Sequence, residues 1–327
     1  VDPRGALVPP RRDRLGGGAA AGGGAEALRG ETRLAPGDRD DGEQRERPDP
    51  WHPEQRLEPL APRVAVEVGG KTVQLRAWRY RVKSELGAEI PVYLLDADLD
   101  ENAADHRHLT DRLYGGDQEH RIKQELLAGI GGVRAIRAYT AVEGRPAPDV
   151  FHMNEGHAGF LGVERIREFM TADKLDFDTA LTVVRSSTVF TTHTPVPAGI
   201  DRFPVEMVQR YFGDDSAAGL LPGVPAQRVL AFGAEDDATK FNMAHMGLRL
   251  AQRANGVSLL HGRVSRTMFE ELWPGFDPAE VPIGSITNGV HAPTWAAPVW
   301  LELGRELAGS TEALREPHVW QRLQQVD

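Results

Sequence analysis

Two short apolar runs, each ending abruptly in polar and glycine residues, constrain this chain most. Residues 149–151 lead into HMNEGH (152–157), and residues 188–190 lead into TTHTP (191–195). A β-branched or aromatic run followed by a turn and a helical pattern predicts a strand of a parallel sheet. Ligands of open α/β sheets bind beyond the carboxyl ends of such strands, so we expect both polar clusters to face one cleft. A third cluster, ITNGVH (286–291), follows the apolar residues 281–283 and joins them.

Hydrophobic spacing predicts further strands and helices around these clusters. A hairpin is expected from residues 64–68 and 72–82 across Gly69-Gly70, with another strand at 90–95. Glycines 129, 131 and 132 interrupt one helical stripe, where we expect them to permit close packing or a break. The predicted helices cover residues 118–139, 158–170, 176–184, 205–211 and 241–254, with Asn255-Gly256 ending the last. The methionine stripe of the helix over residues 241–254 is expected to be core rather than a ligand site.

Composition bounds the class of protein. The 327 residues are 40% hydrophobic, enough for a real core, and the formal charge of -10 argues against nucleic-acid or anionic-membrane partners. The sequence contains neither a long apolar run nor a signal peptide, so we expect no membrane segment. The chain has no cysteine, which excludes disulfides and thiolate chemistry and fits a cytoplasmic protein.

The first 62 residues differ in kind from the rest. Residues 16–25 are only glycine and alanine, arginine is frequent, and no lysine occurs before Lys71. Such a segment cannot bury enough surface to offset its chain entropy, so residues 1–50 are predicted to be disordered. Two explanations stay open for residues 1–62: a flexible low-complexity tail, or an out-of-frame translation that does not belong to the fold.

The first polar cluster raises the question of a metal. His152, Glu155 and His157 are ligand types for zinc, but two histidines five residues apart do not share one helical face. The sequence therefore predicts no metal site, and Asn154 and Glu155 are also placed to cap the following helix. A site rich in asparagine, histidine, glutamate and threonine, without a basic cluster, suits a neutral ligand that carries many hydroxyl groups.

Five segments of the sequence carry a resemblance to a known family. They are LTDRLYGGDQEHRIKQELLAGIGGVRAIRAY, FHMNEGHAGFLGVERI, VFTTHTPVPAGIDRFP, FNMAHMGLRLAQRANGVSLLHGRVSR and IGSITNGVHAPTW. Together they resemble the α-glucan (glycogen, starch and maltodextrin) phosphorylases of the bacterial branch, and the likeness runs in order from about Arg63 to Trp295. It implies an α/β fold, the N-terminal Rossmann-like lobe of a GT-B glycosyltransferase, with the second lobe largely missing.

The resemblance implies an activity and a cofactor. Members of the family release glucose 1-phosphate from the end of an α-1,4-glucan with inorganic phosphate, retaining configuration. They use the phosphate group of pyridoxal phosphate to pass a proton to and from the substrate phosphate. The implied partners are glucan and phosphate, with a homodimer for the full-length protein.

The resemblance also assigns site residues. His193 matches the catalytic-site histidine, which contacts the transferred glucosyl unit, and Asn288 matches the asparagine that binds the same sugar. Glu155 and His157 match residues that line the neighbouring acceptor side. A fixed set of dipoles of this kind stabilises charge that develops on the sugar.

Two further residues match less central positions of the family. Trp295 matches the tryptophan packed beside the cofactor, and Asp117 lies in the segment that resembles the active-site gate loop. The lysine that forms the Schiff base with pyridoxal phosphate belongs to motifs that this sequence does not contain. The family's phosphate-cradling G-G-L-G motif is missing as well.

These departures define the expected domains and alternatives. Residues 63–295 are predicted to form part of the N-terminal catalytic lobe, and residues 296–327 the start of the crossover to the second lobe. We expect a phosphorylase chain that is inactive alone. A non-catalytic glucan-binding module and a nucleotide-sugar transferase resembling glycogen synthase are the alternatives.

Overall fold

A parallel sheet carries all three predicted polar clusters. The computed structural model describes residues 52–83, 89–112, 116–213, 219–289 and 297–309, positions 318 and 321, and the backbone of 32–34 and 46–48. Its parallel strands lie in the order β11-β10-β7-β6. Their carboxyl ends therefore meet at one edge, which confirms the predicted α/β class with a parallel sheet. The strands are β6 (Phe151–Asn154), β7 (Thr188–Thr192), β10 (Arg253–Gly256) and β11 (Ile283–Ser285).

A second, antiparallel sheet precedes it in the chain. Strands β3 (Glu58–Val68) and β4 (Lys71–Lys83) form the predicted hairpin, and β5 (Glu89–Asp96) pairs with β4. Gly69 and Gly70 turn the hairpin with φ of 59° and 75°, a conformation that glycine adopts without steric cost. The buried Asp96 carboxylate accepts from Arg76 Nε at 2.8 Å and Trp78 Nε1 at 2.9 Å. The hairpin and the third strand are thus confirmed.

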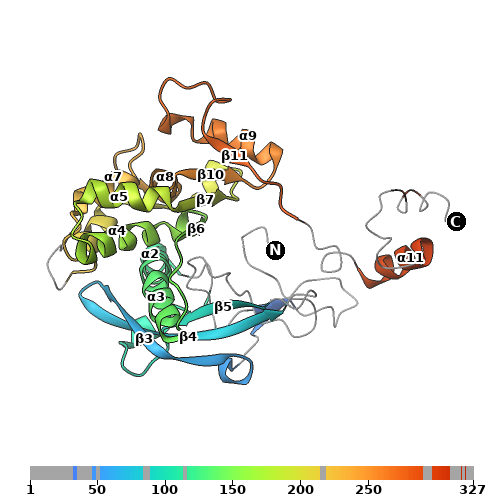
Figure 1. Ribbon diagram of the computed structural model, residues 1–327, viewed down its shortest axis with the longest axis horizontal. Coiled ribbons are helices and arrows are strands. Elements are labelled where there is room, and N and C mark those ends of the chain that lie inside the picture. Colours follow the sequence, from blue (N-terminus) through green and yellow to red (C-terminus); the bar gives the residue numbers. More distant parts are fainter. Residues whose placement is uncertain are drawn as a thin grey trace.

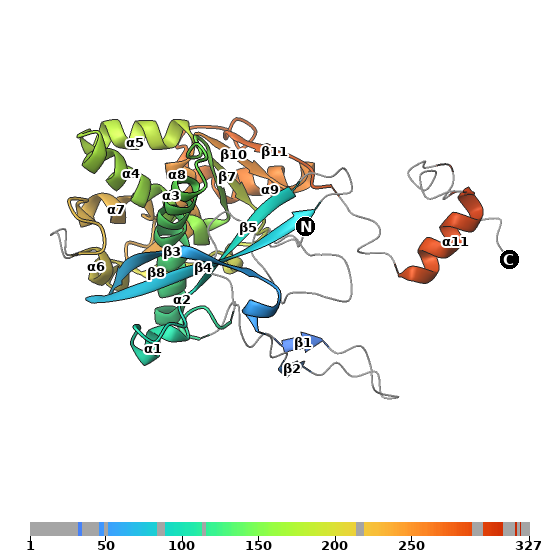
Figure 2. The same cartoon turned by 60° about the horizontal axis from the view of Figure 1, so that its bottom comes forward.

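One helical rod lies between the antiparallel sheet and α4 (Figures 1 and 2). It consists of α2 (Gln118–Leu126), the π-helical turn η2 (Leu127–Gly131) and α3 (Gly132–Val142). A Cβ added at Gly131 would lie 2.6 Å from Leu75 Cδ1, and one at Gly129 would lie 2.8 Å from Phe160 Cβ. The glycines therefore allow close contact with both neighbours, as predicted, and the helical run continues through them as a π turn.

The helices after β6 and β7 contribute buried apolar side chains to the core. In α4 (Phe160–Ala172) the predicted inward face is confirmed, with Phe160, Val163 and Ile166 fully buried. Asp176 caps α5 (Phe177–Ser186) by accepting from two backbone N–H groups at 3.0 Å. The methionine stripe of α8 (Met243–Leu250) is core, as expected, because Met243 and Met246 are fully buried.

The predicted helix over residues 241–254 is wrong at its end. The helix stops at Leu250, and Arg253–Gly256 forms strand β10 between β7 and β11. Gln252 N–H donates to the carbonyls of Arg185 and Thr188, which pulls the chain into the sheet. Asn255-Gly256, predicted as a helix stop, is therefore the end of a buried strand, because tertiary pairing overrides the local helical spacing.

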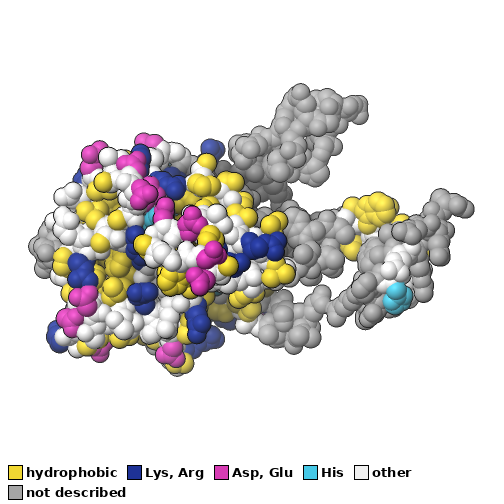
Figure 3. All heavy atoms as spheres, turned by 90° about the horizontal axis from the view of Figure 1, so that it is seen from above, with side chains coloured by type: hydrophobic (Ala, Val, Ile, Leu, Met, Phe, Trp, Pro, Cys, Tyr) yellow, Lys and Arg dark blue, Asp and Glu magenta, His cyan; other side chains and the backbone are white. Residues whose placement is uncertain are grey.

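Surface charge and helix composition complete the description of the fold. Figure 3 shows acidic and basic side chains interspersed over one face of the molecule. Within the described residues, no helix combines the length and apolarity needed to cross a membrane. The other elements are β1 (Thr32–Leu34), β2 (Glu46–Pro48), η1 (Pro53–Gln55), α1 (Ala104–Arg107), η3 (Gly156–Ala158), η4 (Pro197–Gly199), β8 (Arg202–Pro204), α6 (Val205–Phe212), α7 (Ala226–Phe232), β9 (Lys240–Asn242), α9 (Leu259–Met268), η5 (Glu270–Leu272) and α11 (Pro298–Ala308).

Candidate functional site

The loop after β6 turns sharply at Glu155. This residue has φ 68° and ψ 175°, a backbone region that is almost restricted to glycine. Gly156 follows because a Cβ there would lie 2.8 Å from the backbone of Met243 and Ala244 at the start of α8. The strained turn places a glutamate side chain, which is itself buried, at the carboxyl edge of the sheet.

The Glu155 carboxylate holds the loop after β7. Its Oε1 atom accepts from Thr194 N at 2.7 Å, from Thr192 Oγ1 at 3.2 Å, and from the backbone N–H of His193. Backbone donors aimed at one carboxylate oxygen form charge-assisted hydrogen bonds, which are stronger than neutral ones. Glu155 therefore fixes the backbone on both sides of His193.

The imidazole of His193 is fixed as well. Its Nε2 atom lies 2.6 Å from Asn154 Oδ1 on β6. An amide oxygen only accepts, so His193 donates through Nε2–H. The half-buried ring is thus oriented by the end of one strand while its backbone is held by the residue that follows.

Glu155, His157 and His193 line one hollow of about 310 Å³. Asp201 and Ile200 close it from the loop before β8. Burial lowers the pKa of His157, and the nearby Glu155 carboxylate partly opposes that shift. The ring is therefore held towards its neutral form, in which it both donates and accepts a hydrogen bond. A small hollow lined by such groups can recognise a hydroxyl-rich molecule.

Sequence reasoning missed a partly buried cluster of ionisable side chains beside this hollow. Arg121 Nη2 on α2 lies 3.0 Å from Asp201 Oδ2 and 3.3 Å from Glu125 Oε1. Glu125 is buried, and burial, together with the facing Asp201 carboxylate, raises its pKa well above the usual value despite Arg121. The i,i+4 spacing of Arg121 and Glu125 was the available signal, because Glu125 lies beside the apolar stripe of its helix.

The other predicted residues lie elsewhere. Asn288 follows β11 at the same edge of the sheet, with an exposed side chain and its N–H donating to the Val257 carbonyl at 3.1 Å. The exposed Asp117 caps α2 by accepting from His120 N at 2.9 Å and does not line the hollow. His291 and Trp295 fall outside the described residues.

His152 takes part in a chain of hydrogen bonds across three strands. Thr191 Oγ1 donates to Asn255 Oδ1 at 3.1 Å and so accepts from His152 Nε2, 2.7 Å away. The chain links β6, β7 and β10. Among the residues that the structure describes, no group of three histidine, aspartate or glutamate side chains is arranged to hold a metal ion.

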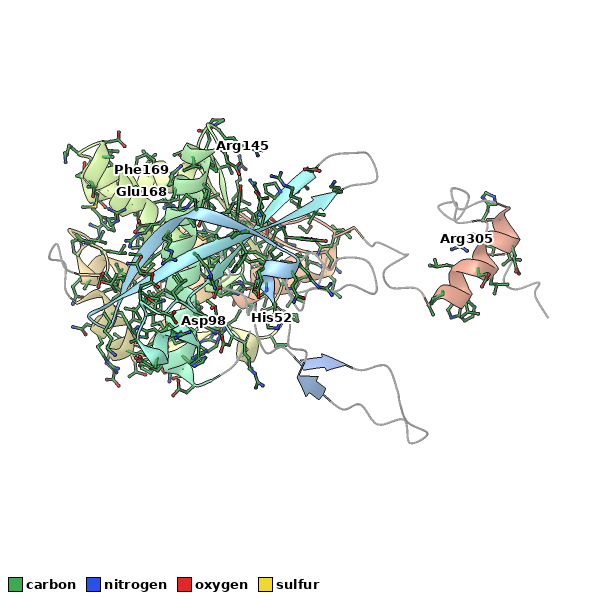
Figure 4. All side chains as sticks on the ribbon, turned by 90° about the horizontal axis from the view of Figure 1, so that it is seen from below. His52, Asp98, Arg145, Glu168, Phe169 and Arg305 are labelled. Carbon is green, nitrogen blue, oxygen red and sulfur yellow. The ribbon has the colours of Figure 1, made fainter. Side chains whose placement is uncertain are left out.

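A second hollow, of about 370 Å³, lies at the far end of α4, where Figure 4 labels Glu168 and Phe169. Its arginines are already paired: Arg137 with Glu168 at 3.1 Å, and Arg167 with Glu164 at 2.6 Å. This hollow therefore offers little unbalanced charge for a ligand. The hollow at the carboxyl edge of the sheet is the better candidate.

Comparisons with known proteins identify the family of this chain. Ligands of open α/β sheets bind beyond the carboxyl ends of the strands, which is the edge where these histidine, asparagine and glutamate side chains lie. A family model described as carbohydrate phosphorylase matches residues 63–215. The chain belongs to the carbohydrate phosphorylase family.

Individual relatives define how far the likeness extends. The chain is 73% identical over 268 residues to a glycogen phosphorylase of Mycobacterium tuberculosis, covering 81% of this chain and 30% of that protein. It is 40% identical over 232 residues to a maltodextrin phosphorylase of Thermococcus litoralis, covering 71% of this chain and 26% of that protein. The chain therefore spans less than a third of the length of these curated relatives.

Proposed function

We propose that this chain is the glucan-facing part of an α-1,4-glucan phosphorylase. In this proposal the parallel-sheet body, within residues 63–295, is the N-terminal lobe of a GT-B glycosyltransferase, and residues 296–327 begin the crossover to the second lobe. The reaction would release glucose 1-phosphate from glycogen or maltodextrin with inorganic phosphate, with retained configuration. The names of the relatives favour this over a nucleotide-sugar transferase of the same architecture.

The observation that carries the proposal is the fixed geometry around His193. Glu155 holds the backbone N–H groups of residues 193 and 194, and Asn154 holds the ring. A sugar ring needs directional donors and acceptors that do not reorganise during the reaction. In our proposal His193 contacts the transferred glucosyl unit, Asn288 binds the same sugar, and His157 and Glu155 line the acceptor side.

The hollow does not fit a pyridoxal phosphate site. The acidic residues Glu155 and Asp201 line it, and no lysine is among the described residues that line it. A phosphate group is held by arginine, lysine or clustered backbone N–H groups, which the Glu155 carboxylate already occupies here. We therefore propose that the chain alone does not form glucose 1-phosphate.

Titration with maltoheptaose by isothermal calorimetry tests glucan recognition. We expect saturable binding that maltohexaose competes for and cellohexaose, its β-1,4 counterpart, does not. His193→Ala should weaken binding about tenfold or more, because it removes a fixed donor to the sugar. His108→Ala is the matched control, because His108 is an exposed histidine that pairs with Asp111. Absent binding by a folded chain, or equal binding of cellohexaose, would contradict the proposal.

A second assay tests whether the chain alone forms glucose 1-phosphate. The chain is incubated with pyridoxal phosphate, maltodextrin and phosphate, then reduced with borohydride and digested. We expect neither glucose 1-phosphate nor a specific reduced adduct. Formation of glucose 1-phosphate together with an adduct at one lysine would contradict the proposal that this chain is inactive alone. Glucan binding without product would support the phosphorylase proposal, with the chain acting as a binding module.

A further inference from the structure

The loop after β10 is organised around the buried histidine His261, which does not line the hollow. Strand β10 ends at Gly256, and Ser258 caps α9 by accepting from His261 N at 3.0 Å. The His261 ring folds back, and its Nδ1 accepts from Val257 N–H at 3.2 Å. Only 8% of the residue is exposed. The ring therefore lies beneath the loop that joins β10 to α9.

This hydrogen bond specifies the protonation state of the ring. A nitrogen that accepts a hydrogen bond carries no proton, so the neutral His261 ring holds its proton on Nε2. Nε2 is itself buried and has no hydrogen-bond partner in the described part of the chain. A buried donor without a partner costs free energy, whereas Nδ1 of the same ring accepts a defined hydrogen bond, so the structural role of the ring lies with Nδ1.

The Val257 backbone connects His261 to Asn288. The peptide unit whose N–H donates to His261 also carries the Gly256 carbonyl, which accepts from Ile286 N at 2.9 Å. The next carbonyl, that of Val257, accepts from Asn288 N at 3.1 Å. Peptide units are planar, so fixing one N–H fixes the direction of the carbonyl behind it. His261 thus sets the backbone to which the loop after β11 is attached.

The surrounding packing leaves the ring one position. A Cβ at Gly256 would lie 2.7 Å from His261 Nδ1, and a Cβ at Gly262 would lie 2.9 Å from Ser285 Cβ at the end of β11. The two glycines let α9 approach both strands closely enough for the imidazole to reach the Val257 N–H. Strand β10, helix α9 and strand β11 are therefore locked together around His261.

We propose that His261 is a positioning residue for Asn288. It acts through the Val257 backbone and does not touch the sugar, and the functional part of this inference rests on the proposed glucan binding by Asn288. An asparagine at position 261 would place Oδ1 near the site of Nδ1 and so keep the acceptor. A leucine would fill similar space without an acceptor.

The test compares His261→Asn and His261→Leu in the full chain, with Ser265→Ala as the control for a change one turn further along α9. Amide hydrogen exchange of Ile286 and Asn288 is measured by NMR, together with maltoheptaose affinity. In the leucine variant we expect Asn288 exchange to speed up and the affinity to fall, each about tenfold. The asparagine variant and the control should stay close to the original chain.

Two results would overturn the inference. One is unchanged exchange of the Asn288 amide in His261→Leu while the amides of β6 and β7 remain protected. The other is a His261 ring that carries its proton on Nδ1 in long-range ¹H–¹⁵N spectra. If the original chain binds no glucan but the exchange pattern follows the expectation, the proposed function fails and the positioning of Asn288 stands.

Discussion

The two halves of the sheet's carboxyl edge are held by different kinds of interaction. The loops after β6 and β7 meet at the buried, charged Glu155, and α8 and the loop before β8 enclose them in a hollow. The loops after β10 and β11 meet through peptide hydrogen bonds and a neutral ring. Side chains at this half are exposed: Leu259, the first residue of α9, by 71%, and Ile286, in the loop after β11, by 65%.

This difference predicts that substitutions in the two halves will affect folding stability and ligand binding to different extents. A hydrogen bond to a charged group contributes about 1.5–3 kcal/mol and a neutral one about 0.5–1.5 kcal/mol. Substitutions in the enclosed half should therefore affect folding and ligand binding together. Substitutions at exposed positions of the open half should affect ligand binding with little effect on folding.

The largest expected effect is that of Glu155→Ala. It leaves two backbone N–H groups of the His193 loop without their acceptor, which should lower the free energy of unfolding by about 3 kcal/mol. Glu155→Gly removes the same acceptor but also the strain at φ 68°, so it should be more stable than the alanine variant by about 1–3 kcal/mol. Urea unfolding measures both, and equal stabilities would show that the turn stores no strain.

A smaller, pH-dependent effect is expected from Glu125→Gln beside the enclosed half. Burial and the Asp201 carboxylate raise the pKa of Glu125 in the folded chain well above its usual value, whereas the unfolded residue titrates near about pH 4.3. The folded state therefore binds more protons above that pH. Stability falls as pH rises from about 4.3 through the raised folded pKa, by at most about 1.4 kcal/mol per pH unit.

The glutamine variant should lose this contribution. It keeps the neutral shape of the side chain, so its unfolding free energy should fall less between pH 5 and pH 8 than that of the original chain. Urea midpoints across this range provide the comparison. Parallel curves for the two proteins would mean that Glu125 ionises normally in the folded state.

His157 in the hollow should make the unfolding free energy depend on pH in the opposite direction. Burial lowers its pKa in the folded chain, so below about pH 6.5 the unfolded chain binds a proton more readily than the folded chain does. Its contribution to stability is complete above that pH and is lost as the pH falls towards the folded pKa. His157→Gln should flatten the acid side of the stability curve, and His108→Gln, at an exposed histidine, should not.

The parts of the structure that depend on local spacing were predictable from the sequence. Strand ends followed by glycine and polar residues correctly placed Glu155, His193 and Asn288 at one edge, because parallel strands bring their carboxyl ends together. Asn288 does not line the hollow with the other two residues, however. Buried stripes such as Phe160 and Ile166 followed from the helical period. These features need no knowledge of distant contacts.

The parts that depend on distant contacts were not predictable. Glu125 meets Asp201, 76 positions later in the sequence, and a charged residue beside an apolar stripe is normally exposed. Strand β10 was missed because apolar residues continue the helical period past Leu250, whereas pairing with β7 decides the conformation. The role of Glu155 as the anchor of the His193 loop likewise required its carboxylate contacts.

The smallest effect on folding, and the sharpest test of the contrast, is expected from Asn288→Ala in the open half. The side chain is exposed, and the backbone N–H that donates to Val257 survives the substitution, so stability should change by less than about 0.5 kcal/mol. Affinity for maltoheptaose should nevertheless fall about tenfold if the amide binds the sugar. Ile286→Ala, two residues earlier in the same exposed loop, is the matched control and should leave affinity unchanged.

Equal losses of affinity in both variants would mean that the loop as a whole, rather than the Asn288 amide, contacts the glucan. A large loss of stability in Asn288→Ala would instead show that the open half is held by side chains, as the enclosed half is, and would remove the contrast between them.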